Sequence, residues 1–177
     1  TTGVTFLQDG IRAADGSTDP DSDGDGVPDA DEPITAGAIR LGSGADTVDI
    51  RNGQVLGDIS FGAGADRLLI SGGAVVRGGI DSGDGQLDIG ISDGRLIATQ
   101  SGEQTISSLS LGDKGALVVT VAPAAGVGSG FNVTGAANLA AGSSVGVRFN
   151  SLIQDPTRFS LIRAGSLTVG EFDQKAI

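Results

Sequence analysis

The residues best suited to chemistry lie near the start of the chain, in a run of acidic side chains. The segment DPDSDGDGVPDADE, residues 19–32, carries seven carboxylates and no basic residue. Within it, DSDGDGVPDADE (21–32) has oxygen donors and a turn-forming glycine at the positions that a twelve-residue calcium loop requires. Because crowded carboxylates repel one another unless a cation lies between them, we expect this loop to bind calcium. The predicted ligands are the side chains of Asp21, Asp23, Asp25, Asp29 and Glu32 and the backbone carbonyl of Val27, with Gly26 at the turn.

The residues around this loop differ from those of an EF-hand, in which helices flank the metal ligands. Pro33 follows the closing glutamate, Pro28 removes a backbone N–H inside the loop, and Gly16 and Pro20 interrupt the stretch before it. The loop therefore resembles the helix-poor calcium repeats of the thrombospondin type 3 kind, which stiffen spacers in secreted proteins. A solvated acidic linker is the alternative interpretation.

A second motif of glycine and aspartate occurs twice, as GSGADTV (42–48) and GAGADRL (62–68). Both copies resemble the nonapeptide of calcium-binding β-rolls, but those repeats follow one another directly, whereas a long stretch separates the two copies here. We therefore expect Asp46 and Asp66 to form turns in which their carboxylates accept hydrogen bonds from backbone N–H groups. A metal-binding role for these two residues stays open.

The composition restricts the chemistry available to the rest of the chain. The 177 residues include no Cys and no His, which excludes thiolate metal sites, cysteine nucleophiles and Ser-His-Asp arrangements. The net charge is -11, and eight of the 22 acidic residues lie between Asp15 and Glu32, so nucleic acid and anionic membranes are poor partners. No apolar run is long enough for a membrane-spanning helix. The lack of cysteine suits export through an oxidising compartment.

The elements that must position these residues are indicated by a repeat of about 20 residues that starts at Ile39. IRLGSGADTVDI (39–50) aligns with ISFGAGADRLLI (59–70), and further copies begin near residues 80 and 108. In each copy, apolar residues alternate over short stretches bounded by Gly, Asp, Asn or Ser, which is the pattern of short strands. Stacked copies would align apolar side chains in internal ladders, one of Ile39, Ile59 and Ile80 and another of Ile50, Ile70 and Ile89.

The predicted fold is all-β: a parallel β-helix, with right-handed winding favoured, built from about seven coils of about 20 residues. We expect Val119 to face its interior. A β-sandwich is the alternative, because it also has short strands separated by turns. The in-register recurrence of Gly-x-Gly-x-Asp favours the β-helix, since the turns of a sandwich have no reason to repeat.

The last third of the chain carries a distinctive pattern of glycine and apolar residues, in ISSLSLGDKGALVVTVAP (106–123), VTGAANLAAGSSVGVRF (133–149) and FSLIRAGSLT (159–168). Residues 106–169 resemble the C-terminal end of autotransporter passenger domains, just before their outer-membrane β-barrel. The resemblance implies a Gram-negative protein of the cell surface or extracellular space, exported through the periplasm and outer membrane. It also implies a β-barrel translocator as partner in the full-length protein, and C-terminal coils that act as an autochaperone.

We expect three regions: an N-terminal segment with the calcium loop (1–33), β-helix coils (34–105) and autochaperone-like coils (106–177). The chain lacks the amphipathic strands of a barrel, so we expect a passenger fragment that does not itself insert into a membrane. The predicted function is a non-enzymatic stalk that supports passenger folding and surface display, with calcium stabilising its N-terminal junction. Its oligomeric state stays open, with a monomer favoured, and any catalytic domain would lie elsewhere in the full-length protein.

Two other functions stay open. A calcium-dependent adhesin or lattice-forming surface protein would contact a host cell or a neighbouring cell. A polysaccharide-acting β-helix enzyme would need acid pairs, for which Asp81, Asp84 and Asp88 are the candidates. The chain offers no His, Tyr or Trp to such a site.

Overall fold

The computed structural model describes residues 2–12, 18–22, 24, 26–152 and 158–170, and the regular structure within them is almost entirely β-strand. These residues form 16 strands and a single short 3-10 helix, Pro123–Ala125. Nothing helical in this part of the chain is long and apolar enough to cross a bilayer. The strands pair in parallel, apart from the antiparallel contact between β12 (Ser108–Ala122) and β13 (Val127–Gly128). The protein is therefore all-β, with mostly parallel sheets.

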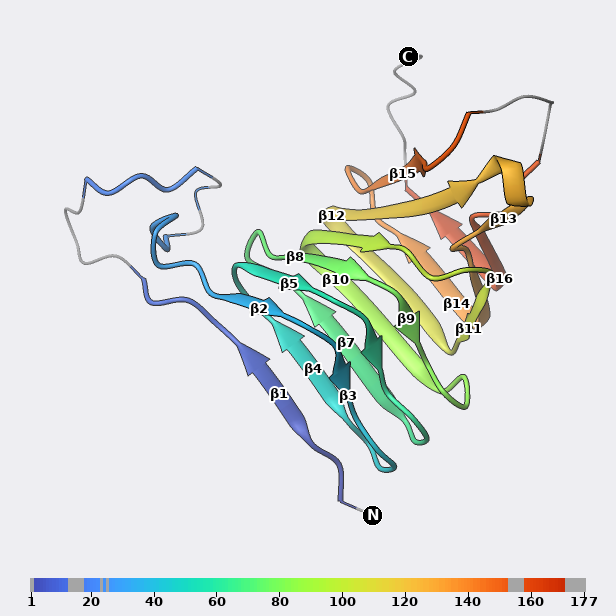
Figure 1. Cartoon of the computed structure of the whole chain (residues 1–177), viewed down its shortest axis with the longest axis horizontal. Helices are drawn as coiled ribbons and strands as arrows, with labels where there is room; N and C mark the ends of the chain where they lie inside the picture. The colour runs from blue at the N-terminus through green and yellow to red at the C-terminus, as the bar shows by residue number, and fades with distance from the viewer. Residues whose placement is uncertain (1, 13–17, 23, 25, 153–157, 171–177) are drawn as a thin grey trace.

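The parallel strands form three series that run side by side across the molecule (Figure 1). The first series contains β1 (Thr5–Gln8), β4 (Thr47–Ile50), β7 (Asp66–Ile70), the first halves of β10 (Leu87–Ala98) and β12, and the second halves of β14 (Phe131–Leu139) and β16 (Ile162–Val169). The second contains β2 (Ile34–Ala36), β5 (Gln54–Leu56), β8 (Val75–Gly78), the second halves of β10 and β12, and β15 (Ser144–Phe149). The third contains the small sheet of β3 (Ile39–Arg40), β6 (Ile59–Ser60) and β9 (Ile80–Asp81), followed by β11 (Gln104–Ile106) and the first halves of β14 and β16.

The pairing register follows the repeat in the sequence. Thr47 pairs with Arg67, and Ile59 pairs with Ile80, so each residue meets its partner one repeat further along the chain. Later in the chain the turns are longer, so that the partner of Phe131 is Ile162, well beyond one repeat length. The predicted repeat length is therefore correct from β4 to β12 and too short for the C-terminal third.

Of the two predicted ladders, the one formed by Ile39, Ile59 and Ile80 is confirmed. The other is right for Ile50 and Ile70 but wrong for Ile89, because the neighbour of Ile70 is Ile91 and the neighbour of Ile89 is Leu68. The third copy of the repeat is slightly longer than the second, which moves the partner of Ile70 beyond position 90. Residues 89 and 91 both point inward, so the alternation pattern alone could not distinguish them.

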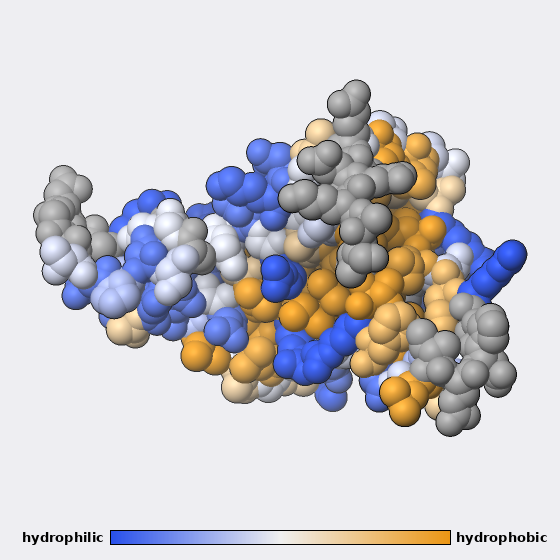
Figure 2. Space-filling model, turned by 90° about the horizontal axis from the view of Figure 1, so that it is seen from above, coloured by the Kyte–Doolittle hydropathy of each residue, from blue (hydrophilic) through white to orange (hydrophobic). Residues whose placement is uncertain are grey.

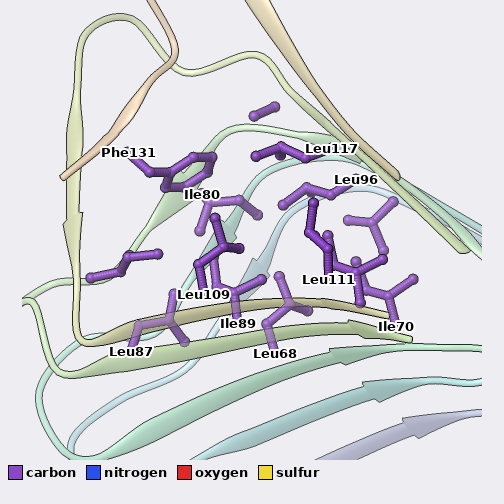
Figure 3. Packing of buried hydrophobic residues seen from close by; sticks show 14 of the residues in the cluster. Leu68, Ile70, Ile80, Leu87, Ile89, Leu96, Leu109, Leu111, Leu117 and Phe131 are labelled. Atoms are coloured by element: carbon purple, nitrogen blue, oxygen red, sulfur yellow. The ribbon is translucent and has the colours of Figure 1, made fainter. Parts of the chain in front are cut away.

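One apolar interior lies between the three series, and it is built mainly from Val, Ile and Leu. In Figure 3, side chains of the first series, such as Leu68 and Ile89, point toward Ile80, Leu96 and Leu117 from the other two. Val119 is completely buried, as predicted. Because neighbouring strands of a sandwich are antiparallel, the parallel pairing does not fit the sandwich alternative.

The glycines of the repeated motif allow the chain to turn between the third and the first series. Gly44 and Gly64 have φ values of +136° and +141°, in the region that favours glycine. A Cβ atom on Gly64 would collide with the carbonyl oxygen of Gly44 in the turn below. The Gly-x-Gly-x-Asp recurrence thus reflects the close stacking of successive turns.

Candidate calcium loop and the acidic turns

The predicted calcium loop belongs to a long insertion between β1 and β2. Residues 9–33 connect these two strands, whereas residues 51–53 suffice between the equivalent strands β4 and β5. The insertion extends beyond the N-terminal strands (Figure 1), and its described residues present a mainly hydrophilic surface (Figure 2). The loop therefore lies outside the repeated part of the fold, at the end where the strand series begin.

Two aspartates organise the backbone of the loop. The two carboxylate oxygens of Asp21 accept hydrogen bonds from the backbone N–H groups of Gly24, at 2.7 Å, and Gly26, at 2.9 Å. Asp29 accepts hydrogen bonds from the backbone N–H of Ser22, at 2.7 Å, and from its hydroxyl, at 2.6 Å. These hydrogen bonds from Ser22 hold the pKa of Asp29 below its ordinary value, because they stabilise the ionised form. The loop is thus closed around carboxylates that are already oriented.

Val27 anchors the loop to the body of the protein. It is only 3% exposed, although the residues around it are mostly exposed or half-buried. Its side chain packs so closely on Gly10 that a Cβ atom there would lie 2.7 Å from Cγ1 of Val27 and 2.8 Å from Oδ1 of Asn52. Asn52 lies in the short β4–β5 turn, so this contact joins the insertion to the first regular turn of the fold. Sequence reasoning identified Val27 only through its carbonyl, and a lone apolar residue in an acidic stretch is the signal for this anchor.

Of the six predicted ligands, the structure describes Asp21, Val27, Asp29 and Glu32, whereas Asp23 and Asp25 lie outside the described residues. Among the described residues, no group of three or more acidic side chains meets the geometry of a metal site. The described residues hold only two of the four predicted aspartate ligands. Calcium binding therefore stays a prediction for this loop.

The predicted turn role of Asp46 and Asp66 is confirmed by their hydrogen bonds. Oδ1 of Asp46 accepts a hydrogen bond from the backbone N–H of Val4 at 2.6 Å, and Oδ1 of Asp66 accepts one from the backbone N–H of Asp46 at 2.8 Å. Each carboxylate thus bonds to the turn preceding its own in the stack. The sequence interpretation missed that both side chains are buried, at 2% and 1% exposure, on the same face as Val48 and Leu68.

The acids considered for catalysis are all engaged in turns or between strands. Asp81 accepts hydrogen bonds from the N–H of Gly83 and the hydroxyl of Ser60. Asp84 accepts hydrogen bonds from the N–H groups of Gly64 and Gln86, and Asp88 accepts one from the hydroxyl of Ser108. These contacts stabilise the stacking of successive turns, which is what repeated turn residues are expected to do.

A polar groove of about 610 Å³ crosses the small sheet of β3, β6 and β9. Its polar lining includes Arg40, Asp58, Ser60, Asp81, Gln100 and Gln104, and none of its lining residues is aromatic. The carboxylate of Asp58 accepts a hydrogen bond from the N–H of Gly79 at 2.6 Å. Asp58 and Asp81 both accept hydrogen bonds from the surrounding backbone. The acids of this groove therefore stabilise the turns around it.

Comparison of the chain with protein-family models, with curated proteins and with solved structures found no match. Two features of the molecule bear on its function: the in-register stacking of parallel strands, and the acidic insertion at the N-terminal end of that stack.

Proposed function

We propose that this chain is a parallel β-helical stalk without catalytic activity, displayed at a bacterial cell surface and stabilised by calcium at its N-terminal end. The observation that carries the proposal is the return of the chain to the same three strand series, with partners one repeat apart through most of the fold. Each circuit through the series is one coil of the β-helix. Such a stack extends a rod and buries an apolar interior, and it needs no active site.

The hydrogen bonds that the acidic side chains accept in turns and between strands support a non-enzymatic role. A glycosidase of this architecture would place an acid and a base on either side of a bound sugar, free to exchange protons. The candidate acids Asp81 and Asp84 instead accept backbone hydrogen bonds in turns. The groove over the small sheet also lacks the aromatic platforms on which sugars commonly stack.

An origin in an autotransporter passenger domain is proposed from the pattern in residues 106–169. The strands of this region support the proposal because they continue the same parallel series. Leu117 pairs with Val145 in β15, and Val133 pairs with Ala164 in β16. In this proposal, the last coils begin the folding of the stack, and a β-barrel translocator in the full-length protein exports it to the cell surface.

The calcium part of the proposal is supported by the donor chemistry of the loop. Asp21 and Asp29 are oriented by hydrogen bonds to the loop backbone, and their oxygens retain lone pairs for a cation. The buried side chain of Val27 packs on Gly10, which lies beside Asn52 of the β4–β5 turn, and thereby holds the loop near the first strands. Asp23, Asp25 and Glu32 would complete a set of oxygen ligands of the kind that Ca²⁺ prefers.

The calcium proposal is tested by the double variant Asp21→Ala/Asp25→Ala. We expect calcium to raise the melting temperature of the wild-type protein and to leave that of the variant unchanged, while both keep the same β-rich circular dichroism spectrum. The matched control is Asp19→Ala/Asp31→Ala, which removes the same charge from the same segment but leaves the ligand positions intact. Calorimetric titration showing wild-type calcium affinity in the Asp21/Asp25 variant would contradict the loop assignment.

A second candidate function is a calcium-dependent, lattice-forming or adhesive surface protein. It is favoured by apolar residues on inward-facing positions of the last strands, which remain exposed: Val147 and Phe149 in β15 are 40% and 51% exposed, and Leu167 and Val169 in β16 are 56% and 44% exposed. Light scattering with and without calcium separates the two functions. Growth in mass on calcium addition supports the lattice, whereas an unchanged monomer with a raised melting temperature supports the stalk.

A further inference from the structure

Two aspartates lie next to each other in the apolar interior of the first coils. Asp66 begins β7 and Asp46 directly precedes β4, and the pairing of Thr47 with Arg67 places the two aspartates beside each other, since paired strands lie about 4.8 Å apart. Both side chains point inward and are at most 2% exposed. On the other side of Asp66 the register places Leu87, which is completely buried. An apolar ladder therefore begins with two carboxylates.

Each of these carboxylates has one oxygen with a partner and one without. The Oδ1 atoms accept backbone hydrogen bonds, whereas the Oδ2 atoms of Asp46 and Asp66 are buried and have no hydrogen-bond partner. None of the ion pairs found in the described part of the chain involves either residue. Two ionised carboxylates in this position would repel each other in a region of low dielectric constant, without a compensating positive charge.

A proton satisfies this arrangement better than a metal ion does. Calcium requires six to eight oxygen ligands, whereas this pair offers only four carboxylate oxygens, two of which already accept backbone hydrogen bonds. A proton on one Oδ2 atom turns that carboxylate into a hydrogen-bond donor and removes one of the two charges. We propose that Asp66, beside the carboxylate of Asp46, holds a proton inside the protein at pH values where exposed aspartates are fully ionised.

The charges around the pair favour uptake of this proton from solvent. Burial raises the pKa of Asp66, and the charges of Asp46 and Asp84 raise it further, against the lowering effect of the hydrogen bond from the Asp46 backbone N–H. Arg67 and Asp88 occupy the next register positions, but they alternate to the outer face of the sheet. The neighbouring strand β1 contributes no titratable side chain.

The first test replaces Asp66 by its amide analogue. In Asp66→Asn, the carbonyl oxygen can still accept the Asp46 N–H, and the amide N–H₂ takes the place of the proposed O–H donor. We expect a melting temperature raised by roughly 2–4 °C at pH 7, the shift that a modest stabilisation gives in a protein of this size. Because a raised pKa makes the wild-type protein more stable as the pH falls through it, this gain should disappear by about pH 4.

The matched control is Asp58→Asn, which removes an exposed carboxylate that accepts a backbone hydrogen bond in another turn and is not among the charges that raise the pKa of Asp66. We expect no gain in melting temperature for this variant at pH 7. If Asp66→Asn lowers the melting temperature by the same amount at pH 7 and pH 4, the pair does not hold a proton and the proposal is wrong.

A direct measurement follows the aspartate carboxyl carbons by ¹³C NMR in the wild-type protein. The Asp66 carboxyl group, assigned by its loss in Asp66→Asn, should remain protonated at pH values where the exposed aspartates have ionised. Ordinary titration of this group would overturn the proposal. A cation bound between Asp46 and Asp66 would also overturn the proposal. In that case calcium would still raise the melting temperature of Asp21→Ala/Asp25→Ala, and the increase would be lost when Asp66→Asn is added. Failure of the calcium loop alone leaves the proton proposal standing, because the two tests use different residues.

Discussion

Strand β12 allows a direct test of which residues face the apolar interior, because two adjacent valines in it point to opposite faces of the sheet. Val119 is 0% exposed and pairs with Ala98 on one side and Val147 on the other, whereas Val118 is half-buried on the outer face. An aspartate in place of Val119 would lose the burial of the valine, about 1.5–3 kcal/mol. Keeping that aspartate protonated at pH 7 costs about 4 kcal/mol more, and burying its neutral carboxyl group without a partner costs about 1–3 kcal/mol.

The total for Val119→Asp, roughly 7–10 kcal/mol, is comparable with the whole stability of a typical domain. We therefore expect Val119→Asp to prevent folding, and Val118→Asp to change the free energy of unfolding by no more than about 1 kcal/mol. The graded variant Val119→Ala removes two methyl groups and should cost about 2–3 kcal/mol, lowering the melting temperature by about 5–10 °C. Circular dichroism and thermal melts measure all three variants. Equal effects of Val118→Asp and Val119→Asp would show that the assigned inner and outer faces are wrong.

Two further predictions concern the turns between coils. Gly64→Ala should lower the free energy of unfolding, measured by chemical denaturation, by at least about 1–3 kcal/mol, which is the cost of a strained backbone conformation. The strain arises because φ is +141° and the new Cβ would meet the Gly44 carbonyl. Gly42→Ala should be tolerated, because no atom lies within 4 Å of the new Cβ. The hydrogen bond from the Gln86 N–H is the main cause that lowers the pKa of Asp84 below its ordinary value of 3.8. Ionised Asp84 therefore contributes stability above that pH, and this contribution should be lost as the pH falls below it. Acid unfolding curves should show this loss in the wild-type protein and not in Asp84→Asn.

Much of the strand pairing could be predicted from the sequence, because two independent periods agree. Alternation of apolar residues identifies the inward face, and the recurrence of the longer repeat identifies the partner strand, as the Ile59–Ile80 pair shows. The continuous strands β10 and β12, of 12 and 15 residues, were not predicted. Gly94 and Gly115 lie within them, and such residues usually suggest a turn. Here they allow neighbouring backbones to approach closely, since a Cβ atom on Gly115 would collide with the carbonyl oxygen of Ile91.

The candidate sites were predicted less completely, because sequence spacing identifies ligand types but not the supporting contacts. The loop positions could be assigned from one stretch of sequence, whereas the contact of Val27 with Gly10 joins residues of no recognisable motif. The buried orientation of Asp46 could have been predicted: it lies two residues before Val48, and the alternation of the strand therefore places it on the inner face. The resemblance to a known turn motif predicts the hydrogen bond of Asp46 but not its burial.

The contacts at the base of the acidic insertion indicate that calcium, in the proposed site, would stabilise this protein without being required for its fold. Gln8, the last residue of β1, is buried, and its amide N–H₂ donates to the carbonyl oxygens of Asn52, at 2.8 Å, and Pro33, at 3.4 Å. Its amide oxygen accepts a hydrogen bond from the hydroxyl of Thr35 at 2.7 Å. Gln8 therefore joins both ends of the insertion to the next coil, through residues that lie outside the predicted ligand set.

With its ends already fixed, the insertion has lost much of the entropy of loop closure before a cation binds. In the proposed site, a calcium ion at Asp21 and Glu32 would connect the two ends of the loop, and its binding free energy would add to the stability of the first strands by mass action. The strands themselves would keep their pairing without calcium, since the hydrogen bonds of Gln8 involve none of the ligands. The geometry therefore favours a calcium-dependent melting temperature with calcium-independent secondary structure, and it argues against a loop whose metal is needed for folding, as in zinc fingers.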